Sequence, residues 1–205
     1  MDFMTREELD QILTAARKYS DILYTFMAIM AYAGLRPSEA LQLRVKDIYI
    51  MGRVVKEITL PGTNTKTRTG RDVPIPQPLT EALERYLIRN ETFEDPSAYL
   101  FPNKQSTHLT LRNMQYAVRK IGYAILHRHV TPKTFRHTYA TLLARKAPLR
   151  SVQQALGHAS ITSTQVYTHP AKDDLKHAID TVFSANIHPF NVDQPLPLNQ
   201  AKKKE

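Results

Sequence analysis

Cysteine is absent from this sequence of 205 residues, and long apolar runs are absent as well. Without cysteine the chain has no disulfide bond, no thiolate nucleophile and no cysteine-ligated zinc site. The most apolar stretch, residues 22–35, is too short to cross a bilayer, which takes about 20 residues, and we interpret it as a core helix. The opening residues are acidic, unlike the basic start of a secretion signal. We therefore expect a cytoplasmic protein.

Closely set carboxylates, which would hold a catalytic divalent metal ion, are also lacking. Positive charge is in excess instead: 28 lysines and arginines against 19 acidic residues give a net charge of +9. Such an excess favours a polyanionic partner, nucleic acid first and an acidic membrane second. No lysine-rich amphipathic helix with exposed aromatic residues stands out, so we expect no membrane partner. From charge alone, an ordinary basic protein remains the alternative.

Capping residues and apolar spacing predict a mainly helical protein. Thr5 and Glu8 form a capping box ahead of a first helix. A second helix is expected up to Gly34, and a third begins at Pro37, since proline suits the first turn. Further helices are predicted over residues 78–89, 110–121, 132–145, 148–156 and 172–183.

A different pattern separates the third and fourth helices. Residues 47–76 alternate, contain β-branched side chains and are interrupted by glycine and proline, which predicts an antiparallel sheet of two or three strands. A basic hairpin is expected around residues 64–71. Residues 186–205 are rich in proline and end in lysines, as in a flexible tail. We predict an α+β fold, mainly α with a small antiparallel sheet, as one domain over residues 1–185.

Several cations are placed where they could bind phosphate. Arg36 precedes the helix at Pro37, beside the free N–H groups of its first turn; the alternative is a surface arginine paired with Glu39. Lys66 lies in the basic hairpin and could reach DNA, or it could be a solvated turn lysine. Lys133 and Arg136 share one helix face, where two cations repel unless an anion lies near them.

The stretch LGHASITSTQVYTH contains a histidine and a tyrosine. A helix is expected to end at Gly157, just before His158, and Ser160 is suited to cap a short following helix that would present the hydroxyl of Tyr167. Taken alone, Tyr167 could equally be an ordinary half-buried tyrosine.

Together these side chains suit phosphoryl transfer. The guanidinium groups of two arginines can each donate two hydrogen bonds to the nonbridging oxygens of a phosphate, where negative charge develops in the transition state. A phenol must lose its proton to attack, and the leaving alkoxide must gain one, from a lysine or a similar acid. The expected chemistry is that of a metal-free covalent phosphotransferase without a cofactor. The candidate residues are Arg36, Lys66, Lys133, Arg136, His158 and Tyr167.

Three segments, GLRPSEALQLRVKDI, KTFRHTYAT and LGHASITSTQVYTH, resemble the catalytic domain of the tyrosine recombinases, the family of phage integrases, Xer-type recombinases and fimbrial invertases. The resemblance extends over residues 5–183. It implies that Arg36 and Arg136 are the two arginines of the family site and that Lys66, eight residues before Pro74, is its hairpin lysine. His158 would be its late histidine, and Tyr167 its nucleophile.

The resemblance implies a site-specific DNA recombinase or integrase. The tyrosine would form a 3′-phosphotyrosyl link to double-stranded DNA and release a 5′-hydroxyl, with neither metal nor ATP. Homotetramers would exchange a C-terminal segment, here the helix expected over residues 172–183, and accessory proteins would assist. Two features depart from the family pattern. Lys133 replaces the first histidine of the box, and no core-binding domain precedes the catalytic part, so the chain is either a fragment or a short recombinase.

Other classes remain open. In a non-enzymatic DNA-binding relative, Lys133 would mark the loss of activity. A type IB topoisomerase would share the tyrosine chemistry. A metal-dependent nuclease or transposase would need clustered carboxylates, and a zinc site would have to be built from histidines alone. The histidines available for such a site are His127, His129 and His137.

Overall fold

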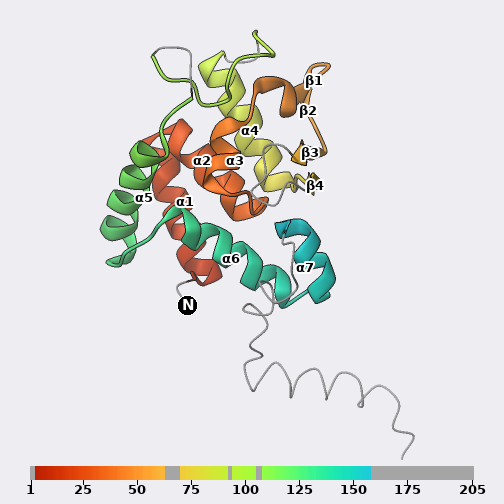
Figure 1. Cartoon of the computed structure of the whole chain (residues 1–205). Coiled ribbons are helices and arrows are strands. Elements are labelled where there is room, and N and C mark those ends of the chain that lie inside the picture. Colours follow the sequence, from red (N-terminus) through yellow and green to blue (C-terminus); the bar gives the residue numbers. More distant parts are fainter. Residues whose placement is uncertain (1–2, 63–69, 92–93, 105–107, 158–205) are drawn as a thin grey trace, which may run out of the picture. The chain divides into compact units, whose positions relative to one another are not determined.

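The computed structural model describes residues 3–62, 70–91, 94–104 and 108–157 of the chain, all within one compact unit. Over these residues the chain forms seven α-helices, one short 3-10 helix and four short strands (Figure 1). The predicted fold class, mainly α with a small antiparallel β component, is confirmed. The helix expected over residues 172–183, the domain boundary at 185 and the tail over 186–205 lie outside the described residues.

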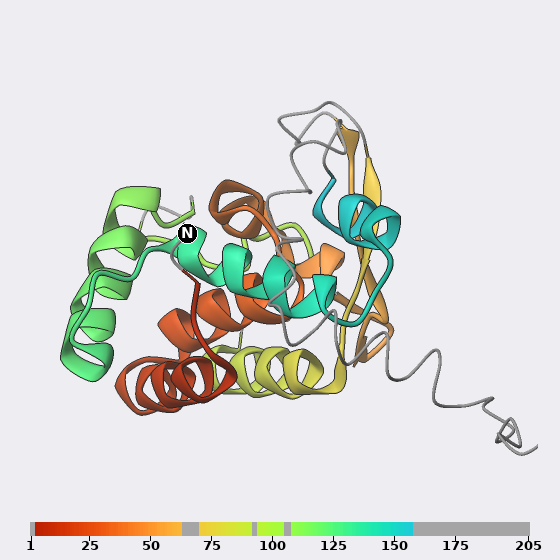
Figure 2. The ribbon, with the colours of Figure 1, turned by 90° about the horizontal axis from the view of Figure 1, so that it is seen from below.

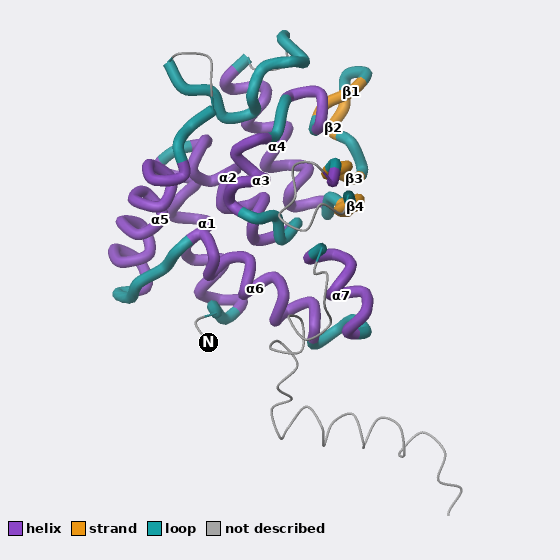
Figure 3. Tube along the Cα trace, in the orientation of Figure 1, coloured by secondary structure: helices purple, strands orange, loops and turns teal. Residues whose placement is uncertain are grey.

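Helix α2 (Asp21–Tyr32) is the centre of the core. Its sequence is apolar nearly all round, and every residue from Thr25 to Ala31 is buried. It packs against α1 (Arg6–Tyr19), α4 (Gln77–Asn90), α5 (Leu111–Leu126) and α6 (Pro132–Ala144). Figure 3 shows these helices as the bulk of the molecule, with the strands at one edge. Within the described part of the chain, no helix is long and apolar enough to span a membrane.

The helix starts follow the local signals in the sequence. At α1 the hydroxyl of Thr5 accepts the N–H of Glu8 at 3.2 Å, and the carboxylate of Glu8 accepts the N–H of Thr5 at 2.8 Å. This is the predicted capping box. Helix α6 likewise begins with a capping threonine, Thr131, followed by Pro132. Because caps act between residues three apart, they can be identified without the fold.

The predicted sheet is divided into two. Strands β1 (Tyr49–Ile50) and β2 (Arg53–Val54) form one antiparallel pair, and β3 (Glu57–Leu60) and β4 (Arg71–Pro74) form another. The expectation of a single sheet was wrong because the chain bends at Lys56, which separates the two hydrogen-bond ladders. In the second pair Leu60 faces Arg71, and residues alternate between buried and exposed. This register turns the side chain of Arg71 inward.

Helix α5 is longer than predicted, continuing past residue 121 to Leu126. Gly122 lies inside it because Val130 packs there: a Cβ on Gly122 would lie 2.5 Å from the Cβ of Val130. The remaining helices are short: α3 (Pro37–Gln42), the 3-10 helix η1 (Val45–Asp47) and α7 (Leu149–Leu156). Helix α7 packs against both α6 and β4 (Figure 2).

Candidate active site

A basic pocket of about 630 Å³ opens where the first residues of α3, α5 and α6 meet. Arg36 comes from the start of α3, and Lys133 and Arg136 come from α6. Leu111 and Gln115 of α5 form part of the wall. The structure therefore brings three of the six predicted site residues to one cavity. Lys66, His158 and Tyr167 lie outside the described residues.

Arg36 is held at the entrance to α3 by Glu39, one turn later. Its Nη1 donates to Oε1 of Glu39 at 2.7 Å, and its backbone N–H donates to Oε2 at 2.7 Å. Its Nη2 also donates to the carbonyl of Gly157 at 3.3 Å. The pairing with Glu39 considered from the sequence thus exists, but in the interior: the side chain of Arg36 is 20% exposed and lines the pocket.

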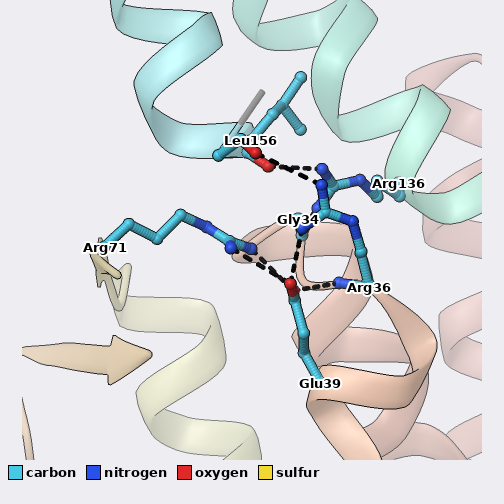
Figure 4. A network of polar contacts seen from close by, with 7 residues as sticks. Gly34, Arg36, Glu39, Arg71, Arg136 and Leu156 are labelled. Atoms are coloured by element: carbon cyan, nitrogen blue, oxygen red, sulfur yellow. Dashed lines mark hydrogen bonds and ion pairs between the residues drawn. The ribbon is translucent and has the colours of Figure 1, made fainter. Parts of the chain in front are cut away.

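Arg136 is buried, with 8% of its surface exposed, and is oriented by two backbone carbonyls. Its Nη1 donates to the carbonyl of Gly34, and its Nη2 donates to the carbonyl of Leu156 at 2.6 Å (Figure 4). Carbonyl oxygens carry only partial charge, so these bonds direct the guanidinium without neutralising it. The side chain of Leu156 is fully buried against Ala140 of α6, which holds the end of α7 beside the arginine.

Sequence reasoning missed Arg71 as a part of this site, and it named Glu39 only as an alternative partner of Arg36. The two Nη atoms of Arg71 donate to the two carboxylate oxygens of Glu39 at 3.2 and 2.7 Å. Glu39 is 3% exposed and Arg71 is 9% exposed. The alternation of β4 could have revealed Arg71, since an arginine at an inward position needs a buried partner.

The ionisation of Glu39 depends on its two arginines. Burial alone raises the pKa of this carboxyl, but the hydrogen bonds from Arg71 and from the backbone and side chain of Arg36 outweigh burial, so its pKa is lowered. Glu39 is therefore a carboxylate at neutral pH. The single negative charge of Glu39 is shared between Arg36 and Arg71, so one positive charge of this group is not balanced. Arg136 and Lys133 add further positive charge at the pocket, which favours a bound anion.

Gly34 allows the backbone to approach α6 closely enough for Arg136 to reach its carbonyl. Its φ is +62°, and a Cβ at this position would lie 2.3 Å from the ring of Tyr139. We expect Gly34→Ala to lower the free energy of unfolding by roughly 1–3 kcal/mol more than Gly52→Ala. Gly52 is a matched control because its φ is +79° but a Cβ there has open space. Urea denaturation of both variants measures the difference, and equal losses would contradict the proposed contact.

Metal ligation has no support among the described residues, where no group of three histidine or acidic side chains is placed to hold an ion. His127 ends α5 with φ +50°, and His137 lines the pocket beside Arg136. The pocket owes its positive charge to Arg36, Lys133 and Arg136. A pocket lined in this way is suited to an anionic ligand such as a phosphate group.

Comparisons with known proteins identify the family. The model of the phage integrase family matches residues 2–174. The tyrosine recombinase XerC of Oceanobacillus iheyensis is 36% identical over 187 residues, which are 86% of this chain and 59% of that protein. The tyrosine recombinase XerA of Pyrococcus horikoshii is 32% identical, over 86% of this chain and 60% of that protein. The chain belongs to the phage integrase family, and it spans about 60% of the length of these relatives.

Solved structures agree with this assignment. The crystal structure of XerA recombinase has a TM-score of 0.74 and 26% identity, covering 88% of this chain and 65% of that one. XerH site-specific recombinase, in a post-cleavage complex with a palindromic difH substrate, has a TM-score of 0.72 and 29% identity, covering 88% of this chain and 52% of that one. The fold is that of a tyrosine recombinase catalytic domain.

Proposed function

We propose that the chain is the catalytic part of a site-specific DNA recombinase that cleaves and rejoins strands through a 3′-phosphotyrosyl intermediate, without metal or ATP. Family membership and the recombinase names of the relatives support the reaction class. The complex of XerH with its difH substrate supports double-stranded DNA as the substrate.

The convergence of Arg36 and Arg136 on one pocket is the observation that carries this proposal. In phosphoryl transfer, negative charge develops on the nonbridging oxygens as the attacking and leaving oxygens align. Two guanidinium forks, already oriented by Glu39 and by backbone carbonyls, can stabilise that charge without rearranging. A scissile phosphate of DNA is the ligand that fits such a pair.

We propose the remaining roles from the resemblance of these segments to the family pattern. The Oη atom of Tyr167 forms a bond to phosphorus as the bond from phosphorus to the 5′-oxygen breaks. The phenolic proton passes to water as Oη attacks, His158 assists at the phosphate, and Lys66 supplies a proton to the leaving 5′-oxygen. The phosphotyrosyl bond retains the energy of the phosphodiester, so a 5′-hydroxyl from another strand can reverse the step without ATP.

Lys133 occupies the position of a histidine in the family pattern. It is exposed and lines the pocket with Arg136, one turn away on α6. We propose that its ammonium group donates to the scissile phosphate. A lysine provides a positive charge and a hydrogen-bond donor that can contact a phosphate oxygen, so electrostatic assistance is the role that we propose.

Assembly is proposed on the same grounds. A homotetramer on two recombination sites, with a C-terminal segment exchanged between protomers and with accessory proteins assisting, would perform strand exchange. The proposed division is a catalytic domain over residues 1–185 followed by a tail over residues 186–205. A cytoplasmic location suits a protein that acts on DNA.

Covalent capture tests the proposed reaction. The full chain is incubated with a pool of nicked duplexes that have randomised arms, and adducts that resist denaturing detergent are isolated and sequenced. We expect an adduct of defined sequence, equal in amount with EDTA or with Mg²⁺, because the chemistry uses no metal.

Each rival class predicts a different result in the same experiment. DNA binding without an adduct would support a non-enzymatic relative in which Lys133 marks lost activity. Relaxation of supercoiled plasmid without recombination would favour a topoisomerase. Cleavage only with Mg²⁺ would favour a metal-dependent nuclease.

A further inference from the structure

Arg71 is a buried cation that is not among the residues lining the pocket. It begins β4, where the register with Leu60 turns its side chain inward. Its guanidinium contacts the end of α7, since a Cβ on Gly157 would lie 2.8 Å from Nη1 of Arg71. Within the described part of the chain its Nε has no hydrogen-bond partner, and the polar contacts of its two Nη atoms are those with Glu39.

Glu39 accepts hydrogen bonds from both sides. Oε1 accepts Nη1 of Arg36 at 2.7 Å and Nη1 of Arg71 at 3.2 Å. Oε2 accepts the backbone N–H of Arg36 at 2.7 Å and Nη2 of Arg71 at 2.7 Å. These four hydrogen bonds fix the orientation of the Glu39 carboxylate (Figure 4). The fixed carboxylate in turn sets the position of the Arg36 guanidinium at the pocket.

The sharing of one carboxylate also affects the charge of Arg36. A buried pair of Arg36 with Glu39 alone would be neutral and would attract a phosphate weakly. Because the bidentate contact with Arg71 already balances Glu39, the positive charge of Arg36 stays available to the pocket. Arg71 thus acts on the pocket through Glu39, without touching the ligand.

We propose that Arg71 is a positioning residue for phosphoryl transfer, which orients Glu39 and keeps the charge of Arg36 directed at the scissile phosphate. This inference rests on the proposed function. A purely structural role, in which Arg71 only attaches β4 to α3 and α7, would affect stability and DNA affinity but not the chemical step.

Five variants distinguish these roles: Arg71→Met, Arg71→Lys, Glu39→Gln, the double variant of Glu39→Gln with Arg71→Met, and the control Arg85→Met. Arg85 also pairs with a carboxylate, at 3.1 Å from Asp21, but on α4 and not among the pocket-lining residues. The substrate is a nicked duplex of the captured sequence. Single-turnover cleavage at saturating protein is measured beside DNA affinity.

We expect Arg71→Met to slow cleavage about 10- to 100-fold, the scale of a displaced catalytic group, while affinity changes less than about threefold. Arg71→Lys should be intermediate, because lysine restores the charge but not the two-pronged contact. In the background of Glu39→Gln, Arg71→Met should cause little further slowing, because the residue through which Arg71 acts has lost its charge. Arg85→Met should cleave like the parent.

The opposite results overturn the inference. The first is a parental cleavage rate in Arg71→Met. The second is an equal loss of DNA affinity and cleavage rate in Arg71→Met. The third is that Arg71→Met slows cleavage as much in the Glu39→Gln background as it does in the parent protein. Circular dichroism checks that each variant is folded. If Arg71→Met does not fold, Arg71→Lys decides, and a parental rate there overturns the inference. If the parent protein forms no adduct with any duplex, the proposed function fails and this inference fails with it.

Discussion

Replacing Tyr167 by phenylalanine is expected to abolish covalent capture of DNA while leaving affinity for the duplex nearly unchanged. Only the nucleophilic oxygen is removed, and the aromatic ring remains. Loss of a nucleophile typically slows covalent catalysis by about 10⁴-fold or more, which places the adduct below detection. Detergent-resistant adducts and gel-shift affinities, measured on one nicked duplex, give the two quantities.

The matched control is Tyr19→Phe, which removes the same atom from an exposed tyrosine on α1. It should form as much adduct as the parent protein. Peptide mapping of the parental adduct should place the DNA on Tyr167. An undiminished adduct in Tyr167→Phe, or DNA attached to another tyrosine, would contradict the assignment of the nucleophile.

Replacing Arg136 by alanine is expected to slow cleavage by about 10²- to 10³-fold, the usual effect of removing one preorganised donor to a transition-state oxyanion. DNA affinity should fall far less, because the charge that Arg136 stabilises develops mainly in the transition state. Arg136→Lys should recover only part of the rate, because an ammonium group cannot contact two oxygens as a guanidinium fork does.

Stability must be measured separately for this residue. Arg136 is buried and bonds to the carbonyls of Gly34 and Leu156, so its removal also loosens the contact of α6 with α7. Arg128→Ala is the control: Arg128 likewise bonds a carbonyl, that of Phe3, and a carboxylate, that of Glu8, but it is not a pocket-lining residue. Cleavage in Arg136→Ala at the rate of Arg128→Ala would exclude a transition-state role.

The helices were predictable because their signals are local. The capping box of Thr5 and Glu8 and the proline after Thr131 act within one turn, so a reader of the sequence has all the interacting residues in view. The spacing of Lys133 and Arg136 is local in the same sense, and the structure places both on one pocket wall. The sheet was predicted less well, because the bend at Lys56 that divides it has no strong local signal.

The sequence by itself determined the class of fold and indicated three cations that line the pocket, Arg36, Lys133 and Arg136. Only the tertiary structure decided how those cations are held. Glu39 and Arg71 are 32 positions apart and meet because the register of β4 turns Arg71 inward against α3. Arg136 is directed by carbonyls at Gly34 and Leu156, which reach it only after α6 and α7 have packed. A buried hydrogen bond depends on where the packed core brings two backbones together, and no local pattern in the chain encodes that position.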